Sequence, residues 1–154
     1  MDALKIFFEA QHVPTHELVR VRKSKLMRDW WDAFAAPHKR PGEQWPAIRN
    51  ESMWEVFSSG CVPYLNQTSA KDAFLAVQPS EFLVIPNSKF PVYRCDATAC
   101  ADVFGLLMDF QNFLETEGQE CLDTYVMDRD HRWTCVFTHE SSWGMGPYYA
   151  FSNA

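Results

Sequence analysis

The chain has 154 residues, of which 47% are apolar and 22% charged, and its formal net charge is −6. This length is usual for one domain, and this composition excludes disordered and fibrous proteins. Residues 1–50 hold nine Lys/Arg and six Asp/Glu, a net +3, whereas residues 51–154 hold five and fourteen, a net −9. Acidic surfaces repel nucleic-acid phosphates and attract basic proteins, so we expect a protein partner and no nucleic acid.

The N-terminal sequence and the cysteines indicate a compartment. No apolar run approaches the roughly 18 to 20 residues of a membrane helix, and "MDALKIFFEA" lacks the basic start and long apolar centre of a signal peptide. The five cysteines are an odd number and include no C-x-x-C pair, which favours reduced thiols and no zinc site. We expect a cytosolic protein without metal, cofactor or membrane segment.

The first half of the chain predicts three helices and one strand. Residues 2–11 predict a short helix, and residues 16–21 a short strand. Residues 23–36 predict a longer helix, because large apolar residues recur there at spacings of three and four: Leu26, Met27, Trp30, Trp31 and Phe34. A loop rich in proline and charge follows over 37–50, and residues 68–77 predict the third helix.

The second half predicts a hairpin, a helix and a terminal meander. The runs "EFLVI" and "PVYRC" can pair as a hairpin, and Asp96 is a suitable N-cap for a helix over about 97–115. "CLDTYVMD", "RWTCVFTHE" and "GPYYAFS" then predict three antiparallel strands, the first two joined by "DRDH". This order indicates a single α+β domain over 1–154, with an antiparallel sheet covered by helices on one face and a C-terminal β-meander.

His139 and Glu140 are the first candidates for chemistry. A zinc protease requires H-E-x-x-H, and position 143 is Trp, so that class is excluded. Cys135 has the same strand parity as His139, but four strand residues separate their Cα atoms by roughly 13 Å, too far for proton transfer. Asp128 and Asp130 could join Glu140 as paired carboxylates, although aspartates in "DRDH" are typical of a hairpin turn.

The segment "THESSWGMGPYYA" can serve as a binding surface or as a closure of the core. Its glycines and Pro147 allow an irregular turn, and Trp143, Tyr148 and Tyr149 are large amphipathic side chains. We interpret His139 as a structural imidazole hydrogen-bonded to backbone, and the tyrosines as having a mixed role.

The same segment carries a resemblance. The order W-T-x-x-x-T-H-E followed by G-P-Y, here beginning at Trp133 and ending at Tyr148, resembles a family of small bacterial proteins. Upstream, Trp54–Phe57 is similar to that family's W-x-x-F segment and Ala70–Phe74 to its A-x-x-A-F helix. Tyr149 departs from it, because the family tends to have Phe there. Such proteins look like the acidic immunity partners of secreted bacterial toxins.

We therefore expect an immunity protein that neutralises a basic cognate toxin by occlusion, with no catalytic, metal or cofactor residues. The residues expected to bind the partner are acidic or aromatic: Glu115, Glu117, Glu120, Asp123, Asp128, Asp130, His139, Glu140, Trp143, Tyr148 and Tyr149. The alternative is a small hydrolase that uses His139 with Glu140 or with an aspartate from 128–130. A third possibility is an adaptor that forms a homo-oligomer.

Overall fold

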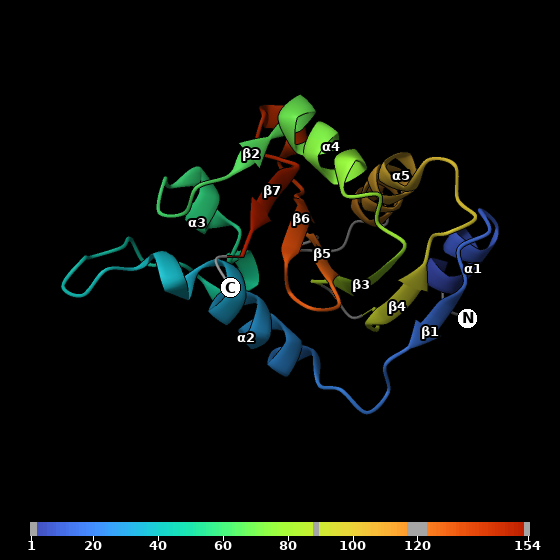
Figure 1. The fold of residues 1–154 in the computed structure, drawn as a ribbon, viewed down its shortest axis with the longest axis horizontal. Helices are drawn as coiled ribbons and strands as arrows, with labels where there is room; N and C mark the ends of the chain where they lie inside the picture. Colours follow the sequence, from blue (N-terminus) through green and yellow to red (C-terminus); the bar gives the residue numbers. More distant parts are fainter. Residues whose placement is uncertain (1–2, 88–89, 117–122, 153–154) are drawn as a thin grey trace.

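The computed structural model describes residues 3–87, 90–116 and 123–152. Five α-helices lie in the described residues, and their order along the chain can be followed by colour in Figure 1. They are α1 (Ala3–Glu9), α2 (Lys23–Phe34), α3 (Glu55–Ser58), α4 (Gln67–Ala76) and α5 (Val103–Thr116). Three single 3-10 turns accompany them: η1 (Ala36–His38), η2 (Asn50–Ser52) and η3 (Ser141–Trp143).

The strands form one seven-stranded sheet with the order β1-β4-β3-β5-β6-β7-β2, and every neighbouring pair is antiparallel. Their bounds are β1 (Thr15–Glu17), β2 (Leu65–Asn66), β3 (Glu81–Pro86), β4 (Tyr93–Asp96), β5 (Thr124–Asp128), β6 (Trp133–Phe137) and β7 (Tyr148–Phe151). The α+β class, the β3–β4 hairpin and the C-terminal meander are thus confirmed. The two outer strands, β1 and β2, are also the shortest.

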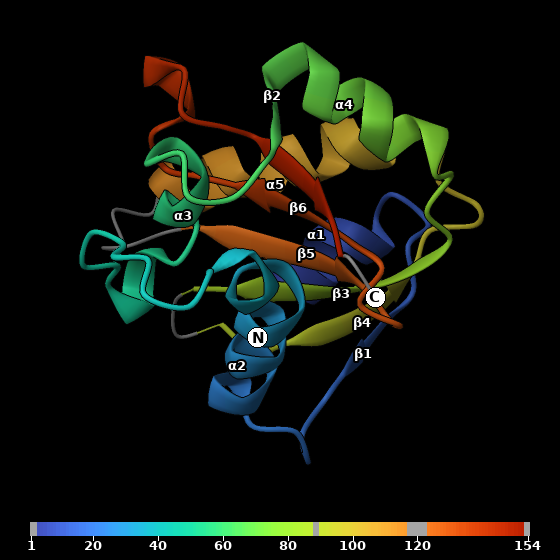
Figure 2. The same cartoon turned by 60° about the vertical axis from the view of Figure 1, so that its left-hand side comes forward.

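Helices cover both faces of the sheet, which corrects the expectation of one covered face. Helices α1, α4 and α5 pack on one face, and α2 and α3 pack on the other (Figures 1 and 2). The alternation along β6 divides its side chains between the two cores, with Cys135 in the first and Val136 in the second. Because both faces are covered, every residue of β5 and β6 is buried.

Helix α2 forms where its apolar stripe predicts, and it buries that stripe against the sheet. Trp30 and Phe34 are fully buried, and the Trp30 ring meets the Tyr125 ring edge-on at 5.2 Å between centroids. The Trp30 indole Nε1 donates a hydrogen bond of 2.8 Å to Thr134 Oγ1, so its polar atom is satisfied inside the core. The helix ends before Pro37, which has no backbone N–H to continue the ladder.

The start of α5 differs from the sequence prediction. The helix begins at Val103, and the Asp102 carboxylate accepts a hydrogen bond of 2.9 Å from the Gly105 backbone nitrogen. Asp96, the predicted cap, instead accepts bonds from the backbone and hydroxyl of Thr98, and these bonds lower the Asp96 pKa. Asp96 therefore closes a turn after β4, and a second aspartate six residues later begins the helix.

None of the helices in the described ranges combines the length and apolar character that a bilayer crossing requires. The four cysteines described, Cys61, Cys95, Cys100 and Cys135, are free thiols.

Replacing Trp30 by alanine should lower the free energy of unfolding by about 3–5 kcal/mol, because a fully buried indole leaves a cavity and Thr134 loses a donor. Urea titration measures the change. Trp143→Ala removes the same side chain from a position that is 76% exposed, so it should shift stability by only about 0.5 kcal/mol or less. Equal losses in the two variants would contradict this packing.

Candidate functional site

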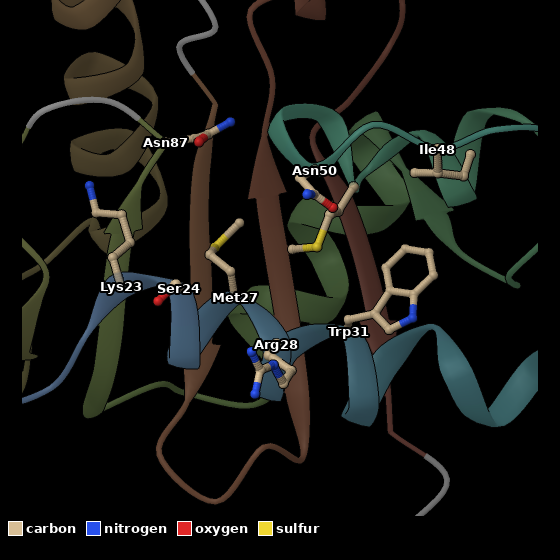
Figure 3. A pocket seen from close by; sticks show the side chains of 9 residues that line it. Lys23, Ser24, Met27, Arg28, Trp31, Ile48, Asn50 and Asn87 are labelled. Carbon is tan, nitrogen blue, oxygen red and sulfur yellow. The ribbon is translucent and has the colours of Figure 1, made fainter.

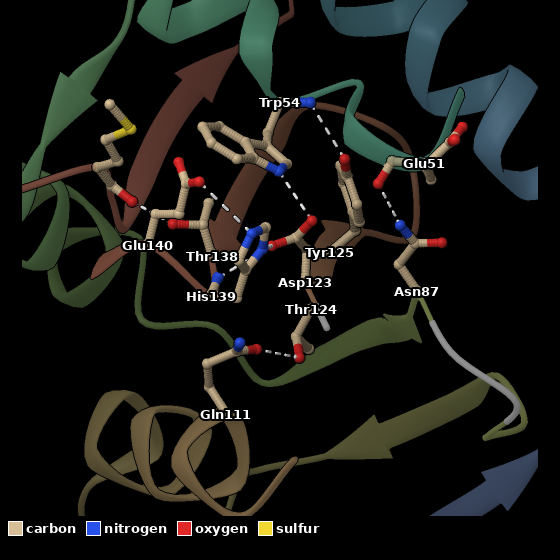
Figure 4. Close-up of polar contacts among 11 residues, drawn as sticks. Glu51, Trp54, Asn87, Gln111, Asp123, Thr124, Tyr125, Thr138, His139 and Glu140 are labelled. Atoms are coloured by element: carbon tan, nitrogen blue, oxygen red, sulfur yellow. Dashed lines mark hydrogen bonds and ion pairs between the residues drawn. The ribbon is translucent and has the colours of Figure 1, made fainter. Parts of the chain in front are cut away.

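An acidic side chain and a histidine meet at one end of the paired strands β5 and β6. Asp123 directly precedes β5, and His139 follows the last residue of β6 by two positions. Because Thr124 lies opposite Phe137, the antiparallel register brings these two positions to the same end of the sheet. Asp123 Oδ1 lies 2.8 Å from His139 Nδ1 and accepts a hydrogen bond of 3.0 Å from the His139 backbone nitrogen (Figure 4).

The second oxygen of the same carboxylate accepts a hydrogen bond from a tryptophan that is distant in the sequence. Trp54, the residue before α3, donates from its indole Nε1 to Asp123 Oδ2 over 2.8 Å. Its backbone nitrogen donates to the Tyr125 hydroxyl over 3.1 Å (Figure 4). Burial, and then the charge of Asp123, raise the pKa of Tyr125 well above its usual value, so this phenol stays neutral. The Asp123 side chain, at 0% exposure, is thus enclosed by donors.

The imidazole of His139 lies between two carboxylates. A carboxylate can only accept, so the contact with Asp123 places the hydrogen on Nδ1 and turns Nε2 toward Glu140, whose Oε1 is 3.6 Å away. The His139 side chain is 37% exposed, whereas that of Asp123 is fully buried. This is the arrangement of an oriented imidazole with one nitrogen fixed and the other near solvent. Chemically, such a ring can accept or donate a proton at Nε2.

We call Asp123 and His139 the dyad. A second polar layer lies beneath the dyad, on α5. The Thr124 hydroxyl donates to Gln111 Oε1 over 2.8 Å, and both side chains are buried (Figure 4). Glu115, one turn further along α5, has its pKa raised by burial, an effect that the Gln111 hydrogen bond and His139 oppose. The acidic residues near the site therefore face inward in part, which reduces what they contribute to a charged surface.

The segment after His139 is fixed to β2 by hydrogen bonds. The Asn66 side chain donates to the Gly144 carbonyl over 3.1 Å and accepts from the Gly146 nitrogen over 3.1 Å. The Thr138 hydroxyl donates to the Met145 carbonyl, and Gly144 has a φ of 81°, a left-handed conformation that favours glycine. We call residues 141–145 the Trp143 loop. It presents the Trp143 side chain to solvent with 76% exposure.

The two predicted tyrosine anchors lie in the core, which corrects the sequence interpretation. Tyr148 is 2% exposed and stacks on Trp54 at 5.8 Å between ring centroids, whereas Tyr149 is fully buried and stacks on Trp133 at 6.1 Å. Both belong to β7, which is covered on both faces by helices. Neither ring is available to a partner, and Trp143 is the aromatic residue of this segment that is exposed.

The predicted acidic residues separate into different environments. Asp123 is buried in the dyad, and Asp128 pairs with Arg132 at 2.8 Å, which lowers the Asp128 pKa against the effect of burial. Asp130 is exposed in the turn between β5 and β6, as the "DRDH" pattern predicts. Glu117 and Glu120 lie outside the described residues.

The carboxylate beside His139 is therefore Asp123 as well as the predicted Glu140. Asp128 and Asp130 lie at the opposite end of β5. The sequence patterns did not predict that Asp123 contacts His139. The signal was the register: in an antiparallel pair, the residue before one strand meets the residues after the other. The His139 ring is held by the Asp123 carboxylate, whereas the sequence predicts a ring hydrogen-bonded to backbone. Cys135 is fully buried, and burial raises its thiol pKa, which removes it as a nucleophile.

Metal chemistry has no ligand set among the residues described: no three His, Cys, Asp or Glu side chains gather there in a metal-binding arrangement. Asp123 and His139 thus form a polar dyad, and the Glu140 carboxylate flanks it.

The sequence model of one family, described as a domain of unknown function, matches residues 8–149. The chain belongs to the DUF4275 family. The match contains the dyad, Trp54 and the Trp143 loop, so all parts of the site lie inside the DUF4275 domain. No curated protein and no solved structure gives a significant match to the chain. Membership of a recognisable family is thus confirmed, and the likeness to immunity proteins stays a prediction.

Replacing Asp123 by asparagine should destabilise this DUF4275 member. The new amide group must face either the Trp54 indole N–H or the His139 backbone N–H, and a buried donor without an acceptor costs about 1–3 kcal/mol. Urea titration should show a loss in that range. Asp130→Asn makes the same exchange on an exposed turn and should change stability by about 0.5 kcal/mol or less. An unchanged Asp123→Asn variant would show that the carboxylate does not hold the site together.

Proposed function

We propose that this protein is a binding module, an immunity protein that neutralises a cognate toxin by occluding it. The observation that carries the proposal is the 76% exposure of Trp143 on a loop held by hydrogen bonds. A large indole left in water is unfavourable, and tryptophan is the residue type most enriched among the energetic centres of protein interfaces. Trp143 replaces the two tyrosines as the anchor.

Further apolar side chains are exposed on segments next to the Trp143 loop. Met145 belongs to the loop itself, and Tyr64 and Leu65 lie on the segment that contains β2. Strand β2 pairs with β7 on one side and is the outermost strand of the sheet, so no other strand of the described residues pairs with its second edge. An apolar rim beside an open strand edge is a surface that favours protein association.

The loop is also suited to binding because it is already ordered. Asn66 bonds to Gly144 and Gly146, and Thr138 bonds to Met145, so the loop conformation is fixed before a partner arrives. Ordering a loop upon association weakens binding, and a loop fixed in advance avoids that loss. This arrangement supports tight association better than a flexible segment would.

The charge distribution supports a basic partner. Residues 51–154 carry a net −9, and this part of the chain contains both the Trp143 loop and β2. Complementary charge accelerates encounter with a basic protein. Because Asp123 and Asp128 are engaged internally, steering arises from the summed field of this region and not from those two side chains.

Trp143→Ala should abolish protection against the toxin without unfolding the protein. The test is co-expression with the product of the adjacent reading frame, scored by growth, followed by calorimetric titration of the purified pair. Loss of an anchor of this type weakens binding by about 30-fold or more, equivalent to 2 kcal/mol. Phe151→Ala is the matched control, since this aromatic side chain is 56% exposed but lies at the opposite end of β7. The proposal fails if both variants protect as well as the parent protein, or if the adjacent product is neither toxic nor bound.

A small hydrolase is the second candidate, and the Asp123–His139 contact of 2.8 Å is the observation that favours it. A buried carboxylate that orients an imidazole is the arrangement of a general base. If the dyad is catalytic, His139→Ala should slow the hydrolysis of p-nitrophenyl esters by at least about 100-fold at a temperature where circular dichroism shows the variant to be folded. Glu17→Gln, a change on the far strand β1, serves as the control. Hydrolysis that persists in His139→Ala excludes this alternative.

A further inference from the structure

A pocket of about 620 Å³ lies between α2 and the segment that leads into α3 (Figure 3). Residues of α2 line one side, and Ile48, Asn50 and Met53 line the other, with Asn87 after β3 at one end. This volume is within the range of small-molecule sites, about 300–1,000 Å³. The pocket shares no residue with the Trp143 loop or with the Asp123–His139 dyad.

One end of the pocket is apolar and flat. Trp31 and Ile48 lie together at that end, and Met27 projects from α2 between them and Lys23 (Figure 3). The Trp31 ring meets the Trp45 ring edge-on at 6.1 Å between centroids, which limits its motion. An indole face and flexible thioethers suit a planar apolar body, because methionine adapts to irregular shapes.

The other end carries a partly buried ammonium group. Lys23 Nζ donates to the backbone carbonyls of Pro86 over 2.7 Å and Phe90 over 2.6 Å, which fixes its position beside Asn87. Burial lowers the pKa of Lys23 to about 8, so the group is still mostly charged at pH 7. A partly desolvated cation gains more from a nearby anion than an exposed one does.

A second cation stands on the same helix. Arg28 is exposed, and no ion pair joins it to any residue in the described part of the chain. Its neighbour Asp29 is engaged by Lys25 at 2.8 Å. The described residues that line the pocket include two cations and two amides, Asn50 and Asn87, and no carboxylate. The described lining thus carries positive formal charge in a protein whose net charge is −6.

We propose that this pocket binds a small organic anion with a planar apolar body and a carboxylate-like head group. The body lies against Trp31 and the methionines, and the Arg28 guanidinium binds the head group, while the Lys23 ammonium, held by backbone carbonyls, adds positive charge at the other end of the pocket. A guanidinium presents paired donors that match two oxygens of one head group, and the amides add hydrogen bonds of fixed direction. The site is independent of the proposed toxin-binding function.

The test compares two probes of the same shape, 2-naphthoate and the uncharged 2-naphthamide, against protein labelled with ¹³C at the methionine methyl groups. We expect saturable shifts of the Met27 and Met53 signals with naphthoate and no shift at Met145 on the Trp143 loop. Naphthoate should bind at least about tenfold more tightly than naphthamide, since only the acid carries a negative charge that the Arg28 guanidinium can pair with.

The matched variants are Arg28→Gln and Arg22→Gln. Each removes one exposed positive charge, Arg22 at the N-cap of α2 and Arg28 in the middle of the helix, but only Arg28 lines the pocket. Arg28→Gln should weaken naphthoate binding by at least about fivefold, whereas Arg22→Gln should leave it within about twofold. The proposal is overturned if naphthamide binds equally well, if the two variants behave alike, or if the Met27 and Met53 signals do not shift at about 5 mM naphthoate.

Discussion

The carboxylate of Asp123 is the contact that joins the distant parts of this fold. It has no exposure to solvent, and an ionised group in such a place is tolerated only when donors surround it. Trp54 supplies one N–H and His139 supplies two, so positions far apart in the sequence converge on two oxygen atoms. Charge-assisted hydrogen bonds are stronger than neutral ones, and three of them define the geometry closely. The start of α3, the start of β5 and the turn after β6 are thereby held together.

Two consequences extend from this carboxylate to the surface. Trp54, fixed through its indole nitrogen, stacks on Tyr148. This residue of β7 therefore packs in the core between the sheet and helices α2 and α3. His139, fixed through its backbone and its ring, sets the direction in which the chain enters the Trp143 loop. Asn66 then closes the loop from the opposite side. The exposed indole is thus the end of a chain of internal contacts, and its position is determined by buried polar groups.

Local patterns predicted much of the fold. The apolar spacing of α2, the alternation of β6 and the turn residues of "DRDH" each encode a local structure, and all three formed as expected. Alternation alone could not show that both faces are covered. That distinction depends on what packs on each face, and the polar residue Thr134 in β6 is buried because Trp30 donates to it. For the same reason the sequence favours partner contacts for Tyr148 and Tyr149, whereas the two rings lie in the two cores.

The site was harder to predict because its contacts are long-range. Glu140 beside His139 is visible in the sequence, whereas Asp123 is sixteen residues away and meets it only through the β5–β6 register. Trp54 lies sixty-nine residues from Asp123, and no local pattern links them. The choice of Asp102 over Asp96 as the residue that begins α5 likewise depends on where the preceding turn ends. Sequence patterns therefore identified the residue types at the site, and the topology determined the pairing.

The uneven charge along the sequence has a spatial counterpart. Four basic residues lie at the N-cap and in the first half of α2, on the face of the sheet that α2 and α3 cover: Arg22, Lys23, Lys25 and Arg28. The Trp143 loop and β2 belong to the acidic remainder, at the edge of the sheet beyond β7. A basic protein would be repelled from α2 and attracted to the β2 edge, and a small anion would be guided the opposite way. The proposed pocket ligand and the proposed protein partner would thus not compete, because each surface would disfavour the ligand of the other.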